Sequence, residues 1–280
     1  MPPTTAGFDL DAPVIIGGVG GSGTRVVAQI ARAAGVNIGS YVNGSLDNVF
    51  FARLICQLPH LWTYPRLAPR FRTFTRLYFG QPLRPGDYWR LYRSARGPVL
   101  KWIWLHLKRS WEGRPTHAQY QKWGWKNPRS QYYLKQLATH FPRCKYVHVM
   151  RHGLDMAYSD NTSQYQRWGQ YFGIPNDPDI PHASRHLDFW IAVNNWVQNQ
   201  CRELLPDRHL ILRFDDLCAQ PEQEVARLLA FLEVSPRCTL EQLTALVQPP
   251  ASLGRYQRHE TPFTPEQVQS VRAFGFDVRV

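Results

Sequence analysis

The stretch that most constrains the fold of this chain is Pro13–Gly35, which reads PVIIGGVGGSGTRVVAQIARAAG. It begins with a short apolar β-branched run, Pro13–Ile16, of the kind found in parallel strands buried on both faces. Several glycines follow, and from Thr24 apolar residues recur at helical spacing. Such a turn points backbone N–H groups and the positive end of the helix dipole at one spot, which suits a phosphate or sulfate. The alternative is that the glycines serve tight packing alone.

The rest of the pattern extends this unit into a larger α/β domain. With 280 residues the chain can bury one full core, as a single domain or as a domain with an insertion. Further strands are expected at Val36–Ser40, Lys145–Met150 and His209–Phe214, and helices at Arg185–Leu204, Glu222–Leu232 and Thr264–Phe274. We therefore expect one domain over residues 1–280, of which residues 1–12 form a disordered lead-in.

Composition excludes several classes of protein. No apolar run approaches the roughly 20 residues that span a membrane, and the N-terminus lacks the basic and apolar regions of a signal peptide. The five cysteines are widely spaced and form no CxxC pair, so we expect no zinc site, no disulfide framework and no bound metal. Free thiols favour a reducing compartment, and we expect a cytoplasmic protein.

Residues 53–125 differ from the flanking sequence. They are rich in arginine and aromatic residues and are broken by prolines, which favours short helices near Tyr88–Ala95 and Leu100–Ser110. Five of its tryptophans lie close together in its second half, namely Trp102, Trp104, Trp111, Trp123 and Trp125. These side chains either belong to the core or form a platform for a sugar or another flat acceptor. We interpret the segment as a mainly helical insertion that covers the acceptor site.

The positive charge is concentrated in the same part of the chain. Between Asp47 and Glu112 ten arginines and two lysines face one acid, Asp87, so this stretch carries +11 of the formal +12. Such a run is either a solvated face or an attractor for an anion, whether an acidic substrate, a lipid headgroup or nucleic acid. No nucleic-acid module is recognisable, so a nucleic-acid partner is not expected. Peripheral membrane contact stays open.

Polar residues outside the glycine turn are candidates for a site. Lys126 stands just before an expected helix, in a turn held rigid by Pro128. Arg151 follows an expected strand and Ser159 lies on the next helix, so both point into the crevice where open α/β sheets bind ligands. An arginine fork and a hydroxyl suit a phosphate. For Lys126 the alternative is an ordinary surface lysine.

Two acids and the C-terminal stretch have simpler interpretations. Asp47 and Asp155 each stand at an expected helix start, where the helix dipole favours a negative charge. Residues 251–259, ASLGRYQRH, are polar and basic, and we expect them to be mobile.

The glycine turn nearly matches the nucleotide-binding pattern GxxxxGK[ST]. The match covers Gly18–Gly23 and fails at the next position, where Thr24 replaces the lysine. No lysine is therefore available there for the β- and γ-phosphates, which disfavours hydrolysis of nucleoside triphosphates.

Four segments instead resemble the sulfotransferases that use 3′-phosphoadenosine 5′-phosphosulfate (PAPS), in the style of the carbohydrate (heparan-type) and bacterial members. GGSGTR resembles the 5′-phosphosulfate loop, and RHGLDMAYS resembles the 3′-phosphate signature. LRFDDLCAQPEQEVARLLAFLEV resembles the family's strand, acidic pair, proline and helix, and SLGRYQ resembles its C-terminal glycine and basic loop. The resemblance implies a P-loop-type three-layer fold with a mostly parallel central sheet flanked by helices.

The resemblance also implies the residues that bind the donor. The 5′-phosphosulfate would be held by Gly20, Gly21, Ser22, Gly23, Thr24 and Arg25. The 3′-phosphate would be held by Arg151 and Ser159, with Gly254 and Arg255 completing that end. PAPS would be the co-substrate and adenosine 3′,5′-bisphosphate the product.

The sequence departs from the family at one position. Many members carry Lys or Arg where this chain has Gly21, and that cation contacts the bridging oxygen of the leaving group. Arg25 and Lys126 are the candidates to replace it, and Lys126 is favoured because KNP resembles the lysine–x–proline of carbohydrate sulfotransferases. LDNVFF resembles the segment in which heparan and tyrosylprotein members place a glutamate base, and Asp47 takes its place. His60 and His106 are the alternative bases.

The resemblance thus implies an enzyme that transfers a sulfuryl group in line to a hydroxyl of a glycan, a lipid-linked sugar or a small metabolite. Asp47 would accept the hydroxyl proton, and Lys126 with the loop would hold the sulfuryl oxygens and the departing phosphate. A non-catalytic nucleotide-binding protein of the same fold is the alternative. The identity of the acceptor, its anionic character and the oligomeric state stay open.

Overall fold

The computed structural model describes residues 7–56, 64–94, 120–260 and 262–278. At its centre lies a 5-stranded sheet in the order β2-β3-β1-β4-β5, and every neighbouring pair of strands is parallel. The strands are β1 (Val14–Gly18), β2 (Val36–Asn37), β3 (Lys122–Lys126), β4 (Lys145–Met150) and β5 (His209–Arg213). Because all strands run in one direction, the residues that follow them gather at one edge of the sheet.

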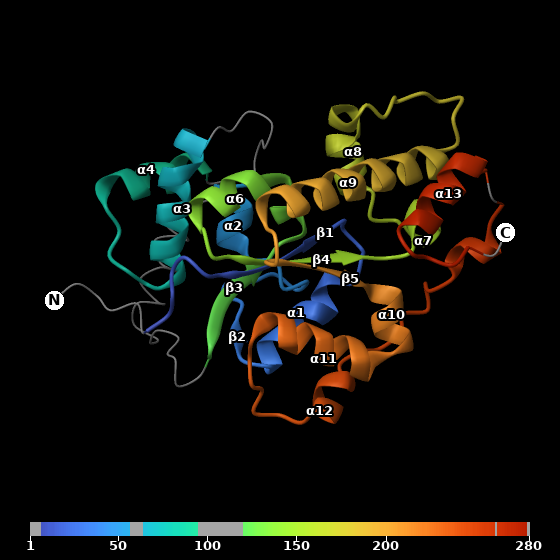
Figure 1. The fold of residues 1–280 in the computed structure, drawn as a ribbon. Coiled ribbons are helices and arrows are strands. Elements are labelled where there is room, and N and C mark those ends of the chain that lie inside the picture. The colour runs from blue at the N-terminus through green and yellow to red at the C-terminus, as the bar shows by residue number, and fades with distance from the viewer. Residues whose placement is uncertain (1–6, 57–63, 95–119, 261, 279–280) are drawn as a thin grey trace.

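Helices cover both faces of this sheet (Figure 1). One layer contains α1 (Thr24–Ala33), α10 (Phe214–Ala219), α11 (Pro221–Leu232) and α12 (Leu240–Thr244). The other contains α2 (Val49–Leu54), α3 (Tyr64–Tyr78), α4 (Pro85–Ser94), η2 (Pro128–Tyr133), α6 (Leu134–His140) and α9 (His182–Leu204). Beyond the carboxyl end of β4 lie α7 (Gly153–Ala157) and α13 (Pro265–Ala273), whereas α8 (Ser163–Trp168) lies over α9. Two short 3-10 helices, η3 (Gly169–Phe172) and η4 (Arg255–Arg258), complete the described helices.

The sheet separates two clusters of buried apolar side chains. Ile15 of β1 packs into the cluster beneath α2, α6 and α9, whereas Ile16 packs into the cluster beneath α1 and α11. Successive residues of a strand point to opposite faces, so one short apolar run serves both layers. The expected three-layer α/β fold with a parallel sheet is confirmed, and β1, β4 and β5 lie where the sequence predicted strands.

The strand next to β1 was not predicted. Residues Lys122–Lys126 form β3, which pairs with both β1 and β2, although the sequence pattern placed most of them in an aromatic insertion. Trp123 and Trp125 are fully buried, and Trp125 stacks on Phe51 with ring centroids 5.0 Å apart. The insertion therefore ends before β3, and these two tryptophans belong to the core rather than to a sugar platform. Trp102, Trp104 and Trp111 lie outside the described residues.

The described parts of the insertion are helical. α3 and α4 pack against α2, and the second of them starts three residues before the expected Tyr88. The helix expected at Leu100–Ser110 lies outside the described residues. Buried Asp87 joins the two helices, since it accepts hydrogen bonds from Thr73 and pairs with Arg76 at 2.9 Å. Asp87, the one acid of the arginine-rich stretch, therefore stabilises the packing of α4 on α3.

The lead-in expected to be disordered is described from Gly7 onward, and there the expectation is wrong. Phe8 is buried in the core beside Phe79, and the indole of Trp123 donates to the carbonyl oxygen of Asp9 at 2.7 Å. The Asp9 carboxylate also pairs with Arg143 at 2.7 Å. Residues 7–12 are therefore held by burial of an aromatic ring and by polar contacts. The sequence of this short segment does not predict either, because the partners lie far along the chain.

Candidate functional site

A glycine turn connects β1 to α1 at the carboxyl edge of the sheet. Gly23 is the N-cap of α1 in the left-handed conformation, and a Cβ atom at this position would collide with the ring of Phe214. Gly21 is also left-handed, with a φ of 97°, so any other residue there is strained. The turn holds the first N–H groups of α1 open toward a cleft, as an anion-binding loop requires.

The cleft beside this turn has a volume of about 380 Å³. It is lined by Gly20, Gly21, Gly23, Thr24, Arg25, Val26, Ser45, Asp47, Lys126, Pro128, Arg151, Asn161, Phe214, Gln248 and Pro250. The structure therefore brings most of the residues singled out from the sequence to one place. Ser22, Ser159, Gly254 and Arg255 do not line it.

Two buried polar atoms at this place lack partners within the described part of the chain. They are the hydroxyl oxygen of Ser22, inside the glycine turn, and the Nε atom of Arg151, at the end of β4. A buried polar atom without a partner costs free energy unless a ligand or water satisfies it. A hydroxyl and a guanidinium beside a helix N-terminus fit the phosphate or sulfate groups of an anionic nucleotide.

Lys126 and Asp47 form an ion pair in the wall of the cleft. Lys126 ends β3, where its side chain is almost fully buried, and its Nζ atom lies 2.5 Å from Oδ1 of Asp47. The same Nζ donates to the carbonyl oxygen of Ser45 at 2.9 Å. Burial lowers the pKa of Lys126 and the charge of Arg25 adds to this effect, whereas Asp47 opposes it without cancelling it. The alternative interpretation of Lys126 as an ordinary surface lysine is therefore wrong.

The loop that carries Asp47 is held by Asn43. The amide oxygen of Asn43 accepts from the backbone N–H of Ser45 and of Asp47 at 2.9 and 2.8 Å. Its Nδ2 atom donates to Oδ2 of Asp47 at 3.0 Å. Asp47 precedes α2, whose N-cap is Asn48 rather than Asp47 itself. The carboxylate is therefore oriented by Asn43 and Lys126 and does not serve as the cap of a helix.

The remaining catalytic candidates from the sequence are Arg25, as a cation, and His60 and His106, as alternative bases. Arg25 lies in the first turn of α1, exposed and lining the cleft, and its charge reaches Lys126. His60 and His106 lie outside the described residues.

Arg151 and Ser159 flank the glycine turn from the side of β4. The guanidinium of Arg151 donates to the carbonyl and hydroxyl oxygens of Ser252 and lies 3.4 Å from Asp155. The hydroxyl of Ser159 accepts from the backbone N–H of Asn161, and a Cβ atom at Gly21 would come within 3.3 Å of it. Ser159 therefore lies against the turn itself rather than beside Arg151 in the cleft wall.

The C-terminal stretch expected to be mobile is hydrogen-bonded to α7. Asp155 is buried and accepts from the backbone N–H of Gly254 at 2.8 Å and of Tyr256 at 3.2 Å. Gly254 is left-handed, and Arg255 donates to the carbonyl oxygen of Tyr158 at 3.1 Å. Asp155 is thus more than a helix-start acid, because its carboxylate links Arg151 to the C-terminal segment.

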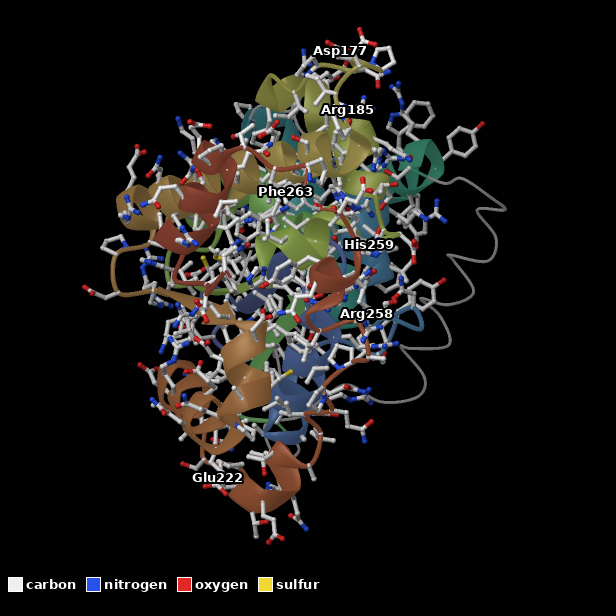
Figure 2. The ribbon with its side chains drawn as sticks, turned by 90° about the vertical axis from the view of Figure 1, so that its right-hand side faces the viewer. Asp177, Arg185, Glu222, Arg258, His259 and Phe263 are labelled. Carbon is white, nitrogen blue, oxygen red and sulfur yellow. The ribbon has the colours of Figure 1, made fainter. Side chains whose placement is uncertain are left out.

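The segment continues along the same side of the molecule. Figure 2 shows Arg258, His259 and Phe263 on one side, between Arg185 at one end and Glu222 at the other. His259 stacks on Tyr158 with ring centroids 4.3 Å apart, and Tyr158 donates to the carbonyl oxygen of Glu260. Aromatic stacking and backbone contacts hold this segment, and a polar sequence gives no local signal for either.

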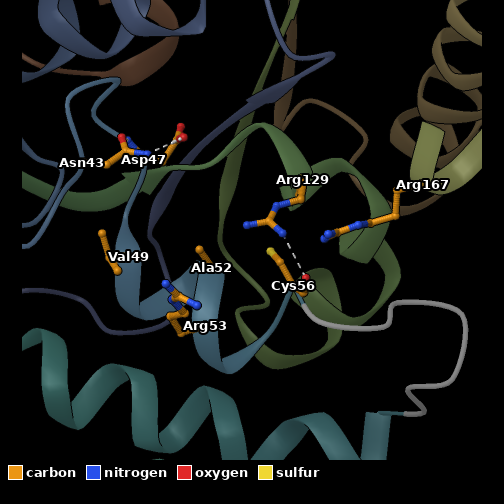
Figure 3. Close-up of a pocket in the computed structure, with 8 residues that line it drawn as sticks. All are labelled: Asn43, Asp47, Val49, Ala52, Arg53, Cys56, Arg129 and Arg167. Carbon is orange, nitrogen blue, oxygen red and sulfur yellow. Dashed lines mark hydrogen bonds between the residues drawn. The ribbon is translucent and has the colours of Figure 1, made fainter. Parts of the chain in front are cut away.

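A second cavity adjoins the first and shares Asp47 with it (Figure 3). Its volume is about 350 Å³, and it is lined by Asn43, Asp47, Val49, Ala52, Arg53, Cys56, Arg129 and Arg167. Burial raises the pKa of Cys56 to about 12, so its thiol is neutral near pH 7 and offers no thiolate nucleophile. Asp47 lines both cavities, whereas Asn43 lines the second cavity and Ser45 lines the first.

Two further observations concern the described residues as a whole. They contain no group of three or more histidine, cysteine, aspartate or glutamate side chains placed to hold a metal ion. Within them, no helix combines the length and the apolar character needed to cross a membrane.

Comparison with known proteins places these features in context. A family model described as the sulfotransferase family matches residues 13–237, which include the glycine turn, Asp47, Lys126 and Arg151. No curated protein sequence matches the chain significantly.

Solved structures with similar folds were also found. A sulfotransferase domain of the Synechococcus PCC 7002 olefin synthase is 16% identical, covers 96% of each chain and has a TM-score of 0.49. Sulfotransferase STF1 of Mycobacterium tuberculosis is 13% identical, with 97% of this chain and 79% of that chain covered and a TM-score of 0.48. A sulfotransferase of Alicyclobacillus acidocaldarius is 15% identical, with 94% and 90% covered and a TM-score of 0.45.

Proposed function

The chain belongs to the sulfotransferase family, and from this premise we propose that it transfers a sulfuryl group from PAPS to a hydroxyl of a glycan, a lipid-linked sugar or a small metabolite. The observation that carries the proposal is the ion pair of Asp47 and Lys126, in which Asp47 lines both cavities and Lys126 lines the cavity with the glycine turn. One cavity has the glycine turn of an anion site, and the other is open to a second molecule. A transfer reaction needs such a shared boundary, because donor and acceptor must meet there.

The donor is assigned to the cavity with the glycine turn. Backbone N–H groups of residues 20–25, the hydroxyl of Ser22 and the side chain of Thr24 bind its 5′ end in this proposal. Arg151 serves the 3′-phosphate, and its unpartnered Nε atom supports that role. Ser159, Gly254 and Arg255 support the same end from behind the cleft wall. Ser159 lies against the turn, Gly254 donates to Asp155 and Arg255 donates to the carbonyl oxygen of Tyr158.

Asp47 is assigned as the base. Its carboxylate faces both cavities, and Asn43 and Lys126 fix the orientation of the two oxygens. The ionised form of the carboxylate is the one that accepts a proton. A base positioned in this way supplies a factor of about 10² to 10⁴ in rate.

Lys126 is assigned as the cation that Gly21 does not provide. When bound, PAPS supplies the sulfuryl group and takes the electron pair of the broken S–O bond. As the acceptor oxygen bonds to sulfur, its proton passes to Oδ1 of Asp47 and neutralises that carboxylate. The ion pair then weakens, so the charge of Lys126 becomes available to the departing phosphate at the moment negative charge develops there. Arg25, exposed at the cleft, adds to the same field.

The test is an incubation of the full chain with PAPS and a library of hydroxyl compounds, with release of adenosine 3′,5′-bisphosphate as the readout. Turnover that is lost in both Lys126→Met and Asp47→Asn supports the proposal. Tight binding of the bisphosphate without turnover of any acceptor favours the second candidate, a non-catalytic nucleotide-binding protein, which the absence of a lysine at Gly21 supports. Five free cysteines support a reducing, cytoplasmic environment for either activity.

A further inference from the structure

The second cavity combines three arginines from three separate parts of the fold. Arg53 comes from α2, Arg129 from η2 and Arg167 from α8. Their positions in the sequence are far apart, and Arg129 and Arg167 lie outside the arginine-rich insertion. The folded chain therefore builds a positively charged cavity that charge counting along the sequence does not locate.

This positive charge is not balanced within the cavity. Asp47 is the one acid among its lining residues, and that carboxylate is paired with Lys126. In the part of the chain that the structure describes, no ion pair joins Arg129 or Arg167 to a carboxylate. The neutral thiol of Cys56 adds no negative charge.

The arrangement of Arg129 and Arg167 points to a ligand. Figure 3 shows the side chain of Arg167 extending toward Arg129, and both residues line the cavity. Among the described residues the guanidinium of Arg129 gives one hydrogen bond, from Nη1 to the carbonyl oxygen of Cys56 at 3.1 Å, and its other N–H groups have no acceptor there. Two guanidinium groups that line one cavity repel each other because both are positively charged. An oxyanion bound between them removes this repulsion and accepts charge-assisted hydrogen bonds from both.

We propose that this cavity binds the acceptor and that the acceptor carries an oxyanion substituent, a carboxylate, sulfate or phosphate, held by Arg129 and Arg167 while the reacting hydroxyl lies at Asp47. The proposal rests on the proposed function and deepens it by naming the acceptor class. A cavity of about 350 Å³ accommodates a small acid or one acidic sugar residue of a longer chain. Val49 and Ala52 provide the apolar part of the wall.

The first experiment compares acceptors that differ only in charge. Glucose, glucuronate, glucose 6-sulfate and glucose 6-phosphate form one matched set, and the hydroxyl library is arranged in similar sets. We expect kcat/KM to be at least about 10-fold higher for oxyanion-bearing members, and to fall as salt screens the exposed arginine. A preference for carboxylate over sulfate and phosphate, or the reverse, identifies which oxyanion is bound. Equal turnover of neutral and anionic members overturns the proposal.

The second experiment tests the two arginines. Arg167→Gln removes an exposed charge and is expected to abolish the preference mainly through KM, since the residue binds the substituent and not the reacting hydroxyl. Arg129→Gln is expected to do the same. Arg202→Gln is the matched control, because Arg202 is exposed on α9 and bonds only to Asn199 and Gln198 among the described residues. An unchanged preference in Arg167→Gln and Arg129→Gln overturns the proposal.

A binding measurement separates this inference from the proposed function. Calorimetric titration measures the affinity for glucuronate, glucose 6-sulfate and glucose 6-phosphate, with glucose as the neutral probe. This measurement does not depend on turnover. Turnover of neutral acceptors with unchanged kinetics in Arg167→Gln means that the enzyme is a sulfotransferase and the acceptor assignment is wrong. Oxyanion binding that Arg167→Gln weakens, without release of adenosine 3′,5′-bisphosphate from any acceptor, supports the cavity assignment and contradicts the transfer reaction.

Discussion

The Nζ atom of Lys126 and the Oδ1 atom of Asp47 lie 2.5 Å apart, although 79 positions separate the two residues in the chain. The sequence suggested a separate role for each, one as the cation and the other as the base. The structure joins them in a single ion pair at the boundary of two cavities. Protonation of one partner therefore changes the charge available from the other, and predictions for the two residues are linked.

Substitution of Lys126 by methionine is expected to lower kcat by about 10² to 10³, because the leaving phosphate loses the cation that stabilises it. Binding of adenosine 3′,5′-bisphosphate should change little, since the proposed function assigns the nucleotide to the glycine turn and Arg151 rather than to Lys126. Turnover and calorimetric affinity are the measurements. Lys122→Met, on the same strand but paired with Glu233, is the control and should keep normal turnover. Normal turnover in Lys126→Met would remove this residue from the reaction.

Substitution of Asp47 by asparagine is expected to lower kcat by roughly 10² to 10⁴, because the amide keeps the shape but accepts no proton. Single-turnover rates with saturating donor isolate this effect from binding. Asp177→Asn, in an exposed loop, is the matched control. If the rate is unchanged, a base outside the described residues, such as His60 or His106, takes over the role.

The rate is expected to fall on the alkaline side at a pH below the ordinary lysine pKa of about 10.4. Burial lowers the pKa of Lys126, so the ammonium form is lost earlier as the pH rises. The pH profile of kcat/KM measures this limb. Lys126→Arg should move the limb to higher pH, since a guanidinium stays charged throughout. The same limb in both proteins would assign it to another group.

Substitution of Asp155 by alanine is expected to weaken binding of adenosine 3′,5′-bisphosphate by roughly 10-fold, since two backbone N–H groups of the C-terminal segment lose a charged acceptor. Arg151 loses its carboxylate partner at the same time. Trypsin should cleave the variant faster at Arg255 or Arg258. Glu222→Ala, on the exposed start of α11, serves as the control. Unchanged affinity together with unchanged cleavage would contradict the anchoring role of Asp155.

Substitution of Asp87 by asparagine is expected to reduce the free energy of unfolding at pH 7 by about 3 kcal/mol, since it breaks a buried ion pair. Burial alone would raise the pKa of Asp87, but hydrogen bonds from Thr73 and Arg84 and the charge of Arg76 outweigh burial and lower it. The stabilisation is therefore present above the unfolded pKa of about 3.9 and is lost as pH falls through the lower folded value. Denaturant titrations of both proteins should converge in acid and differ most near neutrality.

The local parts of the fold were predictable from the chain. β1, the glycine turn and α1 follow from an apolar run, left-handed glycines and helical spacing within 23 consecutive residues, and β4 was predicted with its observed bounds. β3 was not predicted, because Trp123 and Trp125 are separated by a glycine inside a stretch full of aromatic residues. A glycine is required at position 124, since a Cβ atom there would overlap the backbone of Val14 in the neighbouring strand.

The sequence by itself determined β1, β4 and β5, the anion-binding turn and the identity of the polar residues beside it, because each of these depends on neighbours a few positions away. Only the tertiary structure decided which of them meet. Parallel pairing of β3 with β1 brings Lys126 to the glycine turn and, through the loop after β2, to Asp47. The same packing gathers Arg53, Arg129 and Arg167 around one cavity and attaches the C-terminal segment to Asp155. These contacts join distant residues, and no pattern along the chain encodes the distance between them.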